Sequence, residues 1–236
     1  MKSVSYIISG YNEEEIIEET VEECVKILSE QFEDFELILI DDDSKDNTAK
    51  LMEKAQERYP DKIRFLPNYI NLNFGTSILR GFKVATKEYV FYNATDLPLS
   101  LNDTNSIVED MKDNDVLVLE RISYKTTKWR KIVSNINIIL LRLLFPKLIK
   151  GTPILNFTQV FKREAINKVI PLARSPIFIW PEMIFRAKLI GLKVGNRRTN
   201  LNEKYNRVGS FGKPHDIIWG LYDMFRFRIC LWRKKI

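Results

Sequence analysis

The sequence predicts an α/β fold built on a doubly wound, mostly parallel sheet. Short apolar runs of strand length alternate with segments whose apolar residues recur at helical spacing, and several of the runs end in polar residues. Such alternation is typical of strand–helix–strand units with right-handed crossovers. The chain has 236 residues and is 45% hydrophobic, so it can bury a large core, and one domain is favoured over two.

The expected elements follow one another in order along the first hundred residues. Each strand is a short segment rich in apolar or aromatic residues, and the helices that follow carry apolar faces. The first helix, for example, repeats Ile17, Val21 and Val25 at a spacing of four. The expected strands cover residues 4–8, 35–40, 63–66 and 89–92, and helices are expected from about residue 16, from 48 to 58, and up to about 84.

Acidic residues follow two of these strands. The run at residues 89–92 halts at a polar turn that contains Asp96, and ligands of open α/β sheets bind at the carboxyl ends of strands. Asp96 would hold a metal or a phosphate-linked sugar. Asp41 and Asp42 end the second strand, where carboxylates accept from a base N–H or a ribose hydroxyl. The alternatives are an ordinary turn aspartate and an acidic cluster at a helix N-terminus.

Composition narrows the class of function and the compartment. The formal charge of +6 favours an anionic partner such as phosphate or a lipid headgroup. Only two cysteines occur, Cys24 and Cys230, outside any metal-ligand spacing, so no disulfide framework and a reducing compartment are expected. A sole histidine, His215, disfavours a histidine triad. The chain opens on a strand rather than a signal peptide, so a cytosolic start is expected. Residues 136–149 are interrupted by polar residues and are shorter than the roughly 20 apolar residues of a membrane span.

Four short motifs at the expected strand ends resemble those of one family. They are Ser9-Gly10-Tyr11-Asn12-Glu13, Ile40-Asp41-Asp42-Asp43-Ser44 with Asp46 and Thr48, Asn73-Phe74-Gly75 with Gly81, and Ala94-Thr95-Asp96-Leu97. Together they resemble the Pro-x-Tyr-Asn-Glu, Val-Asp-Asp-Gly-Ser, Asn-x-Gly and Asp-Ala-Asp-Leu motifs of the family 2 glycosyltransferases. The resemblance covers the first hundred residues and implies the GT-A fold, which binds nucleotide diphosphate sugars.

This resemblance also implies roles for particular residues. The nucleotide diphosphate sugar would be bound by Tyr11, Asn12, Glu13, Asp41, Asp42, Asn73 and Gly75. Asp96 would hold Mg²⁺ or Mn²⁺. Ala94 stands where the family has the first aspartate of its metal motif, so the cation would be held weakly, with water and the diphosphate completing its shell.

Three later matches are Arg130 with Ser134, Phe161-Lys162-Arg163-Glu164, and Glu182-Met183 with Arg186-Ala187. They resemble the polyprenyl-phosphate branch of the family, typified by dolichol-phosphate mannose synthase. Besides Asp96, the residues with an implied catalytic role are Arg121, Arg130, Ser134, Glu182, Arg207 and Lys213. Arg130 and Ser134 are four residues apart, so on a helix they share a face and could clamp one phosphate. A phosphate monoester is already largely dianionic at neutral pH and needs no base, so a polyprenyl phosphate acceptor with inversion at the anomeric carbon is favoured. The alternatives are a glycan hydroxyl acceptor, with Glu182 as base, and a non-catalytic relative.

The expected organisation is a GT-A domain over residues 1–215, followed by a C-terminal helix over 216–236. Residues 130–150 form an amphipathic segment within the domain, and the C-terminal helix mixes Trp and Tyr with Arg and Lys. Such a composition suits an anionic membrane interface, so peripheral attachment to the cytosolic membrane face is expected, with no nucleic-acid partner. The alternative is a helix packed on the domain or an oligomer contact. The sequence does not specify the sugar, the base or the lipid length.

Overall fold

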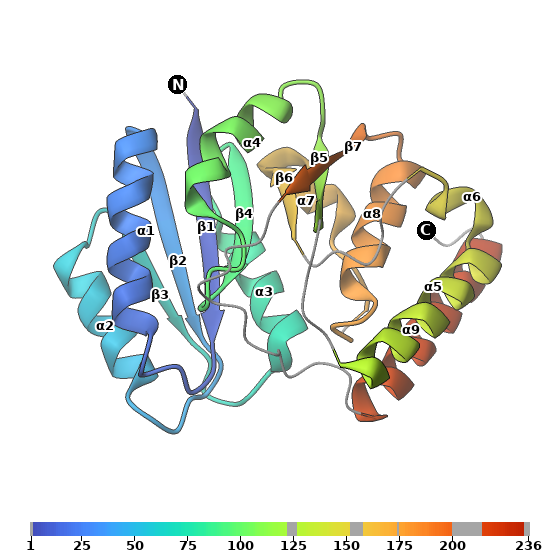
Figure 1. The fold of residues 1–236 in the computed structure, drawn as a ribbon, viewed down its shortest axis with the longest axis horizontal. Helices are drawn as coiled ribbons and strands as arrows, with labels where there is room; N and C mark the ends of the chain where they lie inside the picture. Colours follow the sequence, from blue (N-terminus) through green and yellow to red (C-terminus); the bar gives the residue numbers. More distant parts are fainter. Residues whose placement is uncertain (1, 122–126, 152–157, 174, 200–213, 234–236) are drawn as a thin grey trace.

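The computed structural model describes residues 2–121, 127–151, 158–173, 175–199 and 214–233. These residues form one mixed sheet of seven strands with helices on both faces (Figure 1). The strand order is β3-β2-β1-β4-β6-β5-β7. The strands are β1 (Ser3–Gly10), β2 (Asp34–Asp41), β3 (Ile63–Pro67), β4 (Tyr89–Ala94), β5 (Val116–Arg121), β6 (Gln159–Lys162) and β7 (Val194–Thr199).

The first four strands are parallel, as the alternation of strands and helices predicts. β1 pairs with β2 on one side and β4 on the other, and β2 pairs with β3. The chain therefore leaves β1 in one direction and returns on its other side, which is the switch in strand order where ligands bind in such sheets. β6 is antiparallel to both neighbours, while the edge strand β7 runs parallel to β5.

Helices cover the sheet in two layers. The larger elements are α1 (Ile17–Gln31), α2 (Thr48–Arg58), α3 (Asn73–Val84), α4 (Thr104–Asp110), α5 (Lys128–Leu144), α7 (Arg163–Val169), α8 (Ile179–Leu189) and α9 (Pro214–Trp232), with short turns η1 (Leu101–Asp103) and α6 (Pro146–Ile149). Side chains alternate between the two layers along each strand. Tyr6 and Ile8 pack with α1 and α4, whereas Ile7 packs with α3 and α8.

A glycine lets α3 approach the sheet closely. A Cβ added to Gly81 would lie 2.7 Å from Ile7 Cγ2 and 2.9 Å from Ile40 Cδ1, both closer than ordinary contact. Any larger residue would push the helix away from β1 and β2. The position of α3, which begins beside the carboxyl end of β2, therefore depends on this residue.

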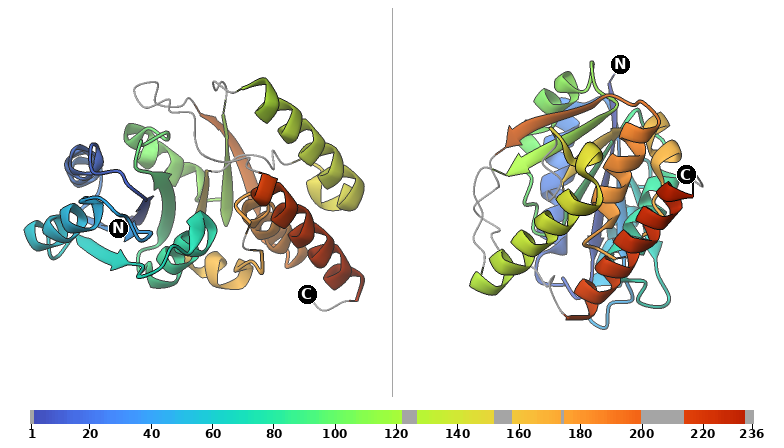
Figure 2. Two further views of the ribbon diagram at one scale, coloured as in Figure 1. Left: turned by 90° about the horizontal axis from the view of Figure 1, so that it is seen from below. Right: turned by 90° about the vertical axis from the view of Figure 1, so that its right-hand side faces the viewer.

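α5 and α9 extend along the same end of the molecule (Figures 1 and 2). They are joined to α8 by a buried cluster of four phenylalanine rings, Phe145, Phe178, Phe185 and Phe227. The ring centroids of Phe145 and Phe185 are 4.9 Å apart, and those of Phe145 and Phe227 are 5.7 Å apart. One side of α9 is thus part of the core, and its opposite side is exposed.

Candidate active site

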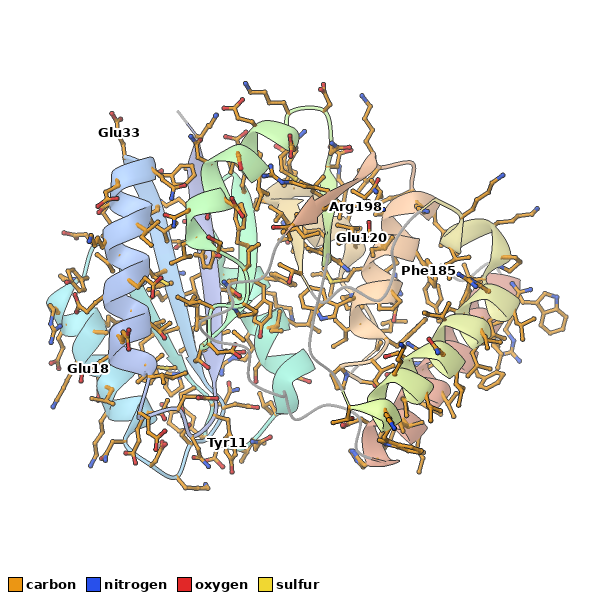
Figure 3. All side chains as sticks on the ribbon, in the orientation of Figure 1. Tyr11, Glu18, Glu33, Glu120, Phe185 and Arg198 are labelled. Atoms are coloured by element: carbon orange, nitrogen blue, oxygen red, sulfur yellow. The ribbon has the colours of Figure 1, made fainter. Side chains whose placement is uncertain are left out.

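The loops that follow β1 and β2 are bonded to one another at the carboxyl end of the sheet. The backbone N–H of Asn12 donates to Ser44 Oγ (2.9 Å), and the N–H of Lys45 donates to Asn12 Oδ1 (2.8 Å). The N–H of Glu13 donates to Thr48 Oγ1 (2.8 Å). Figure 3 labels Tyr11 at this end of the molecule, opposite Glu33. The two loops therefore form one braced surface rather than two independent segments.

The same loops contain two residues with left-handed backbone conformation. Asn12 has φ of 56° and Asp43 has φ of 67°. Asn and Asp tolerate this region better than other non-glycine residues, at some cost in energy. Asp43 lies where the related motif has glycine, which adopts that conformation freely. The shape of the turn is thus retained here without the glycine.

Asp46 stabilises the start of α2 beside these loops. Its Oδ1 accepts from the N–H and the hydroxyl of Thr48 at 2.9 and 2.6 Å. Burial alone would raise the pKa of Asp46, but the hydrogen bonds from Thr48 outweigh it and hold that pKa below its usual value. Asp46 therefore stays ionised as an anchor of the loop.

Asp42 is the centre of a buried hydrogen-bond network. Its Oδ1 accepts from Asn68 Nδ2 (2.8 Å), Ser77 Oγ (2.8 Å) and the N–H of Leu72 (2.9 Å). Its carbonyl accepts from Asn71 Nδ2 (3.1 Å). These bonds fix the segment between β3 and α3 against the end of β2. Asp42 thus supports the predicted nucleotide site through buried hydrogen bonds.

Asp41 differs from its neighbour because one of its oxygens has no partner. Oδ2 accepts from the N–H of Ser44 at 3.2 Å. Oδ1 is buried and has no hydrogen-bond partner among the described residues, and the whole residue is 3% exposed. A buried acceptor without a donor is costly. Asp41 is therefore the carboxylate of the pair that is suited to receive a ligand N–H or O–H.

Asp96 lies in a short turn that is held at both ends. The N–H of Leu97 donates to the carbonyl of Ala94 (3.0 Å), which closes the turn around Asp96. Asn93 clamps the following residues, since its Nδ2 donates to the Leu99 carbonyl (2.9 Å) and its Oδ1 accepts from the Leu99 N–H (3.2 Å). The half-buried Asp96 thereby lies in a turn whose shape is fixed by hydrogen bonds.

Three further features characterise this turn. Leu97 has φ of 41° and is 1% exposed, which is an unusual conformation for a large buried residue. The Thr20 hydroxyl donates to the Thr95 carbonyl at 2.7 Å. Asn93 also donates to the Tyr6 hydroxyl (3.2 Å), and burial raises the pKa of Tyr6, so that its hydroxyl stays protonated. Strain of this kind is often found at functional sites.

The described residues fit a divalent cation that is held mainly by the diphosphate of the nucleotide-sugar donor. They contain no group of three or more His, Cys, Asp or Glu side chains placed to hold a metal. Asp96 supplies one carboxylate, Ala94 supplies none, and Asn93 is occupied by Leu99 and Tyr6. Mg²⁺ is commonly bound through one or two carboxylates together with substrate phosphates. One carboxylate plus a diphosphate matches that pattern.

Glu182 is a buried anchor in this structure. It is 1% exposed, and its two oxygens accept from the N–H groups of Leu172 (2.9 Å) and Ala173 (2.8 Å). Oε1 also accepts from Arg186 Nε at 2.7 Å. The carboxylate therefore fixes the segment before α8, and these contacts favour a positioning role over that of a general base.

The remaining predicted site residues are placed only in part. Glu13 is half-buried, and Gly75 is buried in the first turn of α3, where Asn73 is the first residue. Arg121 ends β5, and Arg130 and Ser134 lie one turn apart on α5. Arg207 and Lys213 lie outside the described residues. The structure thus brings together, at one edge of the sheet, the residues that are predicted to bind the nucleotide sugar.

Asn68 and Ser77 contact the predicted nucleotide-binding aspartates, although the sequence did not identify them. Asn68 immediately follows β3, and its N–H donates to the Asp41 carbonyl at 2.8 Å. The available signal was a polar residue directly after an apolar strand, as at Asp41. Ser77 lies on the buried side of α3 and carries no sequence signal of its own.

A sheet of this order with carboxylates at the ends of β2 and β4 defines the GT-A fold. The structure of glucosyl-3-phosphoglycerate synthase from Mycobacterium tuberculosis in complex with Mn²⁺ and UDP-glucose matches with a TM-score of 0.67 at 17% identity. The match covers 96% of this chain and 79% of that one. Residues 5–170 match the model of glycosyl transferase family 2, and the chain belongs to that family.

Two curated relatives have names that refer to polyprenyl phosphates. The chain is 29% identical over 138 residues to undecaprenyl-phosphate 4-deoxy-4-formamido-L-arabinose transferase of Proteus mirabilis, covering 57% of this chain. It is 26% identical over 253 residues to dolichyl-phosphate beta-glucosyltransferase of Dictyostelium discoideum, covering 98% of this chain and 77% of that protein. The match with the Proteus protein spans only 42% of its length.

Proposed function

We propose that the chain transfers a hexose from a nucleotide diphosphate sugar to a polyprenyl phosphate at the cytosolic face of a membrane, with inversion. Membership of family 2 and the two polyprenyl-phosphate relatives support this proposal. On the donor side, the unpaired oxygen of Asp41 and the built loop of Asp96 lie at the ends of β2 and β4. The nucleotide would lie over Asp41, and the diphosphate would lie near Asp96.

The hydrogen bonds that both oxygens of Glu182 accept are the observation that favours a phosphate acceptor over a hydroxyl. A hydroxyl must lose its proton as the new bond forms, so it needs a base. Under the hydroxyl-acceptor alternative Glu182 would have to be that base, and both of its oxygens accept hydrogen bonds inside the protein. A phosphate monoester has a second pKa near 6 and is already a nucleophile at neutral pH. The site therefore has only to orient it.

In the proposed reaction, a phosphate oxygen attacks the anomeric carbon as the bond from that carbon to the diphosphate breaks. Arg130 and Ser134 would orient the acceptor phosphate, with Arg121 approaching from β5. Arg207 and Lys213 would neutralise charge on the departing diphosphate. Asp96 would hold Mg²⁺ or Mn²⁺, which stabilises the same charge when bound. No proton is transferred to an enzyme base in this scheme.

The exposed face of α5 and α9 suits a membrane-bound acceptor. Apolar residues recur at helical spacing on the outside of both helices: Trp129, Ile132, Ile136, Ile139 and Leu143 on α5, and Ile218, Tyr222, Phe225, Ile229 and Trp232 on α9. Exposed cations accompany them, and α5 contains no acidic residue. Among the described residues, no helix is both long enough and apolar enough to cross a bilayer. The exposed apolar residues and cations of α5 and α9 support peripheral binding to anionic lipid as the proposed mode of attachment.

Replacing two exposed side chains of this face should weaken membrane binding. Leu143 and Trp232 are 72% and 80% exposed, so the double variant Leu143→Ser, Trp232→Ser should fold normally. Its partitioning onto anionic vesicles should fall at least about tenfold, equivalent to about 1.4 kcal/mol, because two apolar contacts with lipid are lost. Sedimentation with vesicles measures the effect, and added salt should weaken binding of the parent protein.

The matched control removes exposed apolar side chains elsewhere. Tyr69 and Ile190 are 88% and 52% exposed and lie outside α5 and α9. The variant Tyr69→Ser, Ile190→Ser should sediment with vesicles as the parent does. If both double variants bind equally well, α5 and α9 are not the attachment surface.

The pH dependence of transfer tests the acceptor chemistry. With a short polyprenyl phosphate, kcat/KM should rise with pH through the second pKa of the acceptor phosphate, near 6, because the dianion is the nucleophile. A phosphonate analogue has a higher second pKa, and the rise should move to higher pH with it. A rise at the same pH for both acceptors would assign the titration to an enzyme base and favour the hydroxyl-acceptor alternative.

A further inference from the structure

We infer that Arg198 is a further residue that binds the acceptor phosphate and that Glu120 orients it, an inference that rests on the proposed function. Arg198 lies on the edge strand β7, and its side chain is 76% exposed. Its Nε donates to Glu120 Oε2 at 3.4 Å. Figure 3 labels both residues on the half of the molecule that lies away from Glu18 and Glu33.

The pair lies close to the carboxyl ends of two parallel strands. Glu120 is in register with Arg198, and the next register pair joins Arg121 to Thr199. Arg121 and Thr199 are the last residues of β5 and β7. The carboxyl ends of strands are where ligands bind in open α/β sheets. Arg198 therefore lies one register position from Arg121, which is itself proposed to contact the acceptor phosphate.

The alternation of side chains along β5 places the pair on the side of the sheet that packs against α5. Val116 belongs to the same buried cluster as Leu141 of α5. Glu120 lies an even number of residues further along the strand, so its side chain points to the same side as that of Val116. Arg198, which bonds to Glu120, shares that side. The pair thus lies on the side of the helix that carries the proposed phosphate-binding residues.

The bond to Glu120 leaves one edge of the Arg198 guanidinium for a ligand. The bond uses only Nε, so the two Nη groups take no part in it. A guanidinium is planar, and paired N–H groups on one edge match two oxygens of a phosphate. The guanidinium would then lie between the Glu120 carboxylate and the phosphate and offset their repulsion. Because an exposed ion pair adds little to stability, a role in binding explains this pair better than a role in folding.

The neighbouring arginine provides a matched control. Arg197 points to the opposite side of the sheet, where it bonds to Asp110 (2.7 Å) and Ser106 (2.9 Å) of α4. The variants Arg197→Ala and Arg198→Ala each remove one arginine and one ion pair from β7. Only Arg198→Ala removes a cation from the side of the sheet that packs against α5.

Calorimetry with farnesyl phosphate, a short polyprenyl phosphate, tests the inference without knowledge of the sugar. Arg198→Ala should bind it at least about tenfold more weakly than the parent, whereas Arg197→Ala should bind it as the parent does. Arg198→Lys keeps the charge but loses the paired N–H groups, so its affinity should be intermediate. Farnesol has the same chain without the phosphate, and its binding should not differ among the four proteins.

The other outcomes separate this inference from the proposed function. Equal affinity of Arg198→Ala and the parent for farnesyl phosphate, or an equal loss in both alanine variants, would overturn the role of Arg198. Absence of farnesyl phosphate binding by the parent would contradict the proposed acceptor instead. Sedimentation with anionic vesicles that lack polyprenyl phosphate tests a lipid headgroup as the ligand. If Arg198→Ala weakens sedimentation but not farnesyl phosphate binding, Arg198 contacts membrane lipid and the inference is wrong.

Discussion

Replacing Asp96 with alanine should lower kcat by about 10³-fold and leave the fold intact. Asp96 is the one carboxylate of the metal motif, because Ala94 occupies the other position. Loss of a group that stabilises transition-state charge typically costs 10²–10³-fold in kcat. A backbone bond and Asn93 also hold the turn, so we expect the fold to survive the substitution. Steady-state kinetics at saturating Mn²⁺ measures the change, and Asp61→Ala, an exposed position, serves as the control.

The converse change should strengthen metal use. Ala94 ends β4 two residues before Asp96, and Ala94→Asp adds a second hard oxygen ligand. The Mn²⁺ concentration for half-maximal activity should therefore fall. A wild-type protein that works at full rate in excess chelator, together with an active Asp96→Ala variant, would show that Arg and Lys side chains neutralise the diphosphate without a cation.

Replacing Asp42 should mainly lower stability, whereas replacing Asp41 should mainly lower nucleotide affinity. Asp42→Ala leaves Asn68, Ser77 and the Leu72 N–H without their shared acceptor, so the free energy of unfolding should fall by about 3 kcal/mol. Asp41→Ala removes one bond to the Ser44 N–H and should change stability much less. Its nucleotide affinity should fall at least about tenfold, roughly 1.4 kcal/mol.

Denaturation and calorimetry on both variants separate stability from ligand binding. The matched pair makes the comparison sharp, since the residues are adjacent and the substitution is the same. Unchanged nucleotide affinity in a folded Asp41→Ala variant would show that the base of the nucleotide does not bind at this strand end. Unchanged stability in Asp42→Ala would show that its network is not needed for folding.

The parallel half of the sheet is the part of the fold that local sequence predicts best. Strands such as β4 begin with a continuous apolar and aromatic run, and α1 has a clear apolar face, so each element is recognisable on its own. The direction of β6 could not be predicted, because it depends on pairing with β4 and β5, far away in sequence. Likewise, α9 has one buried side and one exposed side. Its composition alone does not show that Phe227 joins a core cluster with Phe145.

The candidate site follows the same rule. The motif identifies Asp41 and Asp42 together, but their roles separate only when Asn68, Leu72 and Ser77 arrive from β3 and α3. Glu182 is another example, because the sequence does not show that its two oxygens accept hydrogen bonds from a segment about ten residues away. Sequence pattern predicts which residues gather at a strand end. Long-range hydrogen bonds decide which of their atoms are left for a ligand.

The most direct test of the account is identification of the transfer product. The protein would be incubated with labelled GDP-hexose or UDP-hexose and with either a short polyprenyl phosphate or the polyprenol of the same length, and products would be identified by mass and anomeric configuration. We expect a hexosyl polyprenyl phosphate of inverted configuration and no product from the alcohol. Transfer to the alcohol or to a glycan hydroxyl but not to the phosphate, or nucleotide-sugar binding without any transfer, would contradict it.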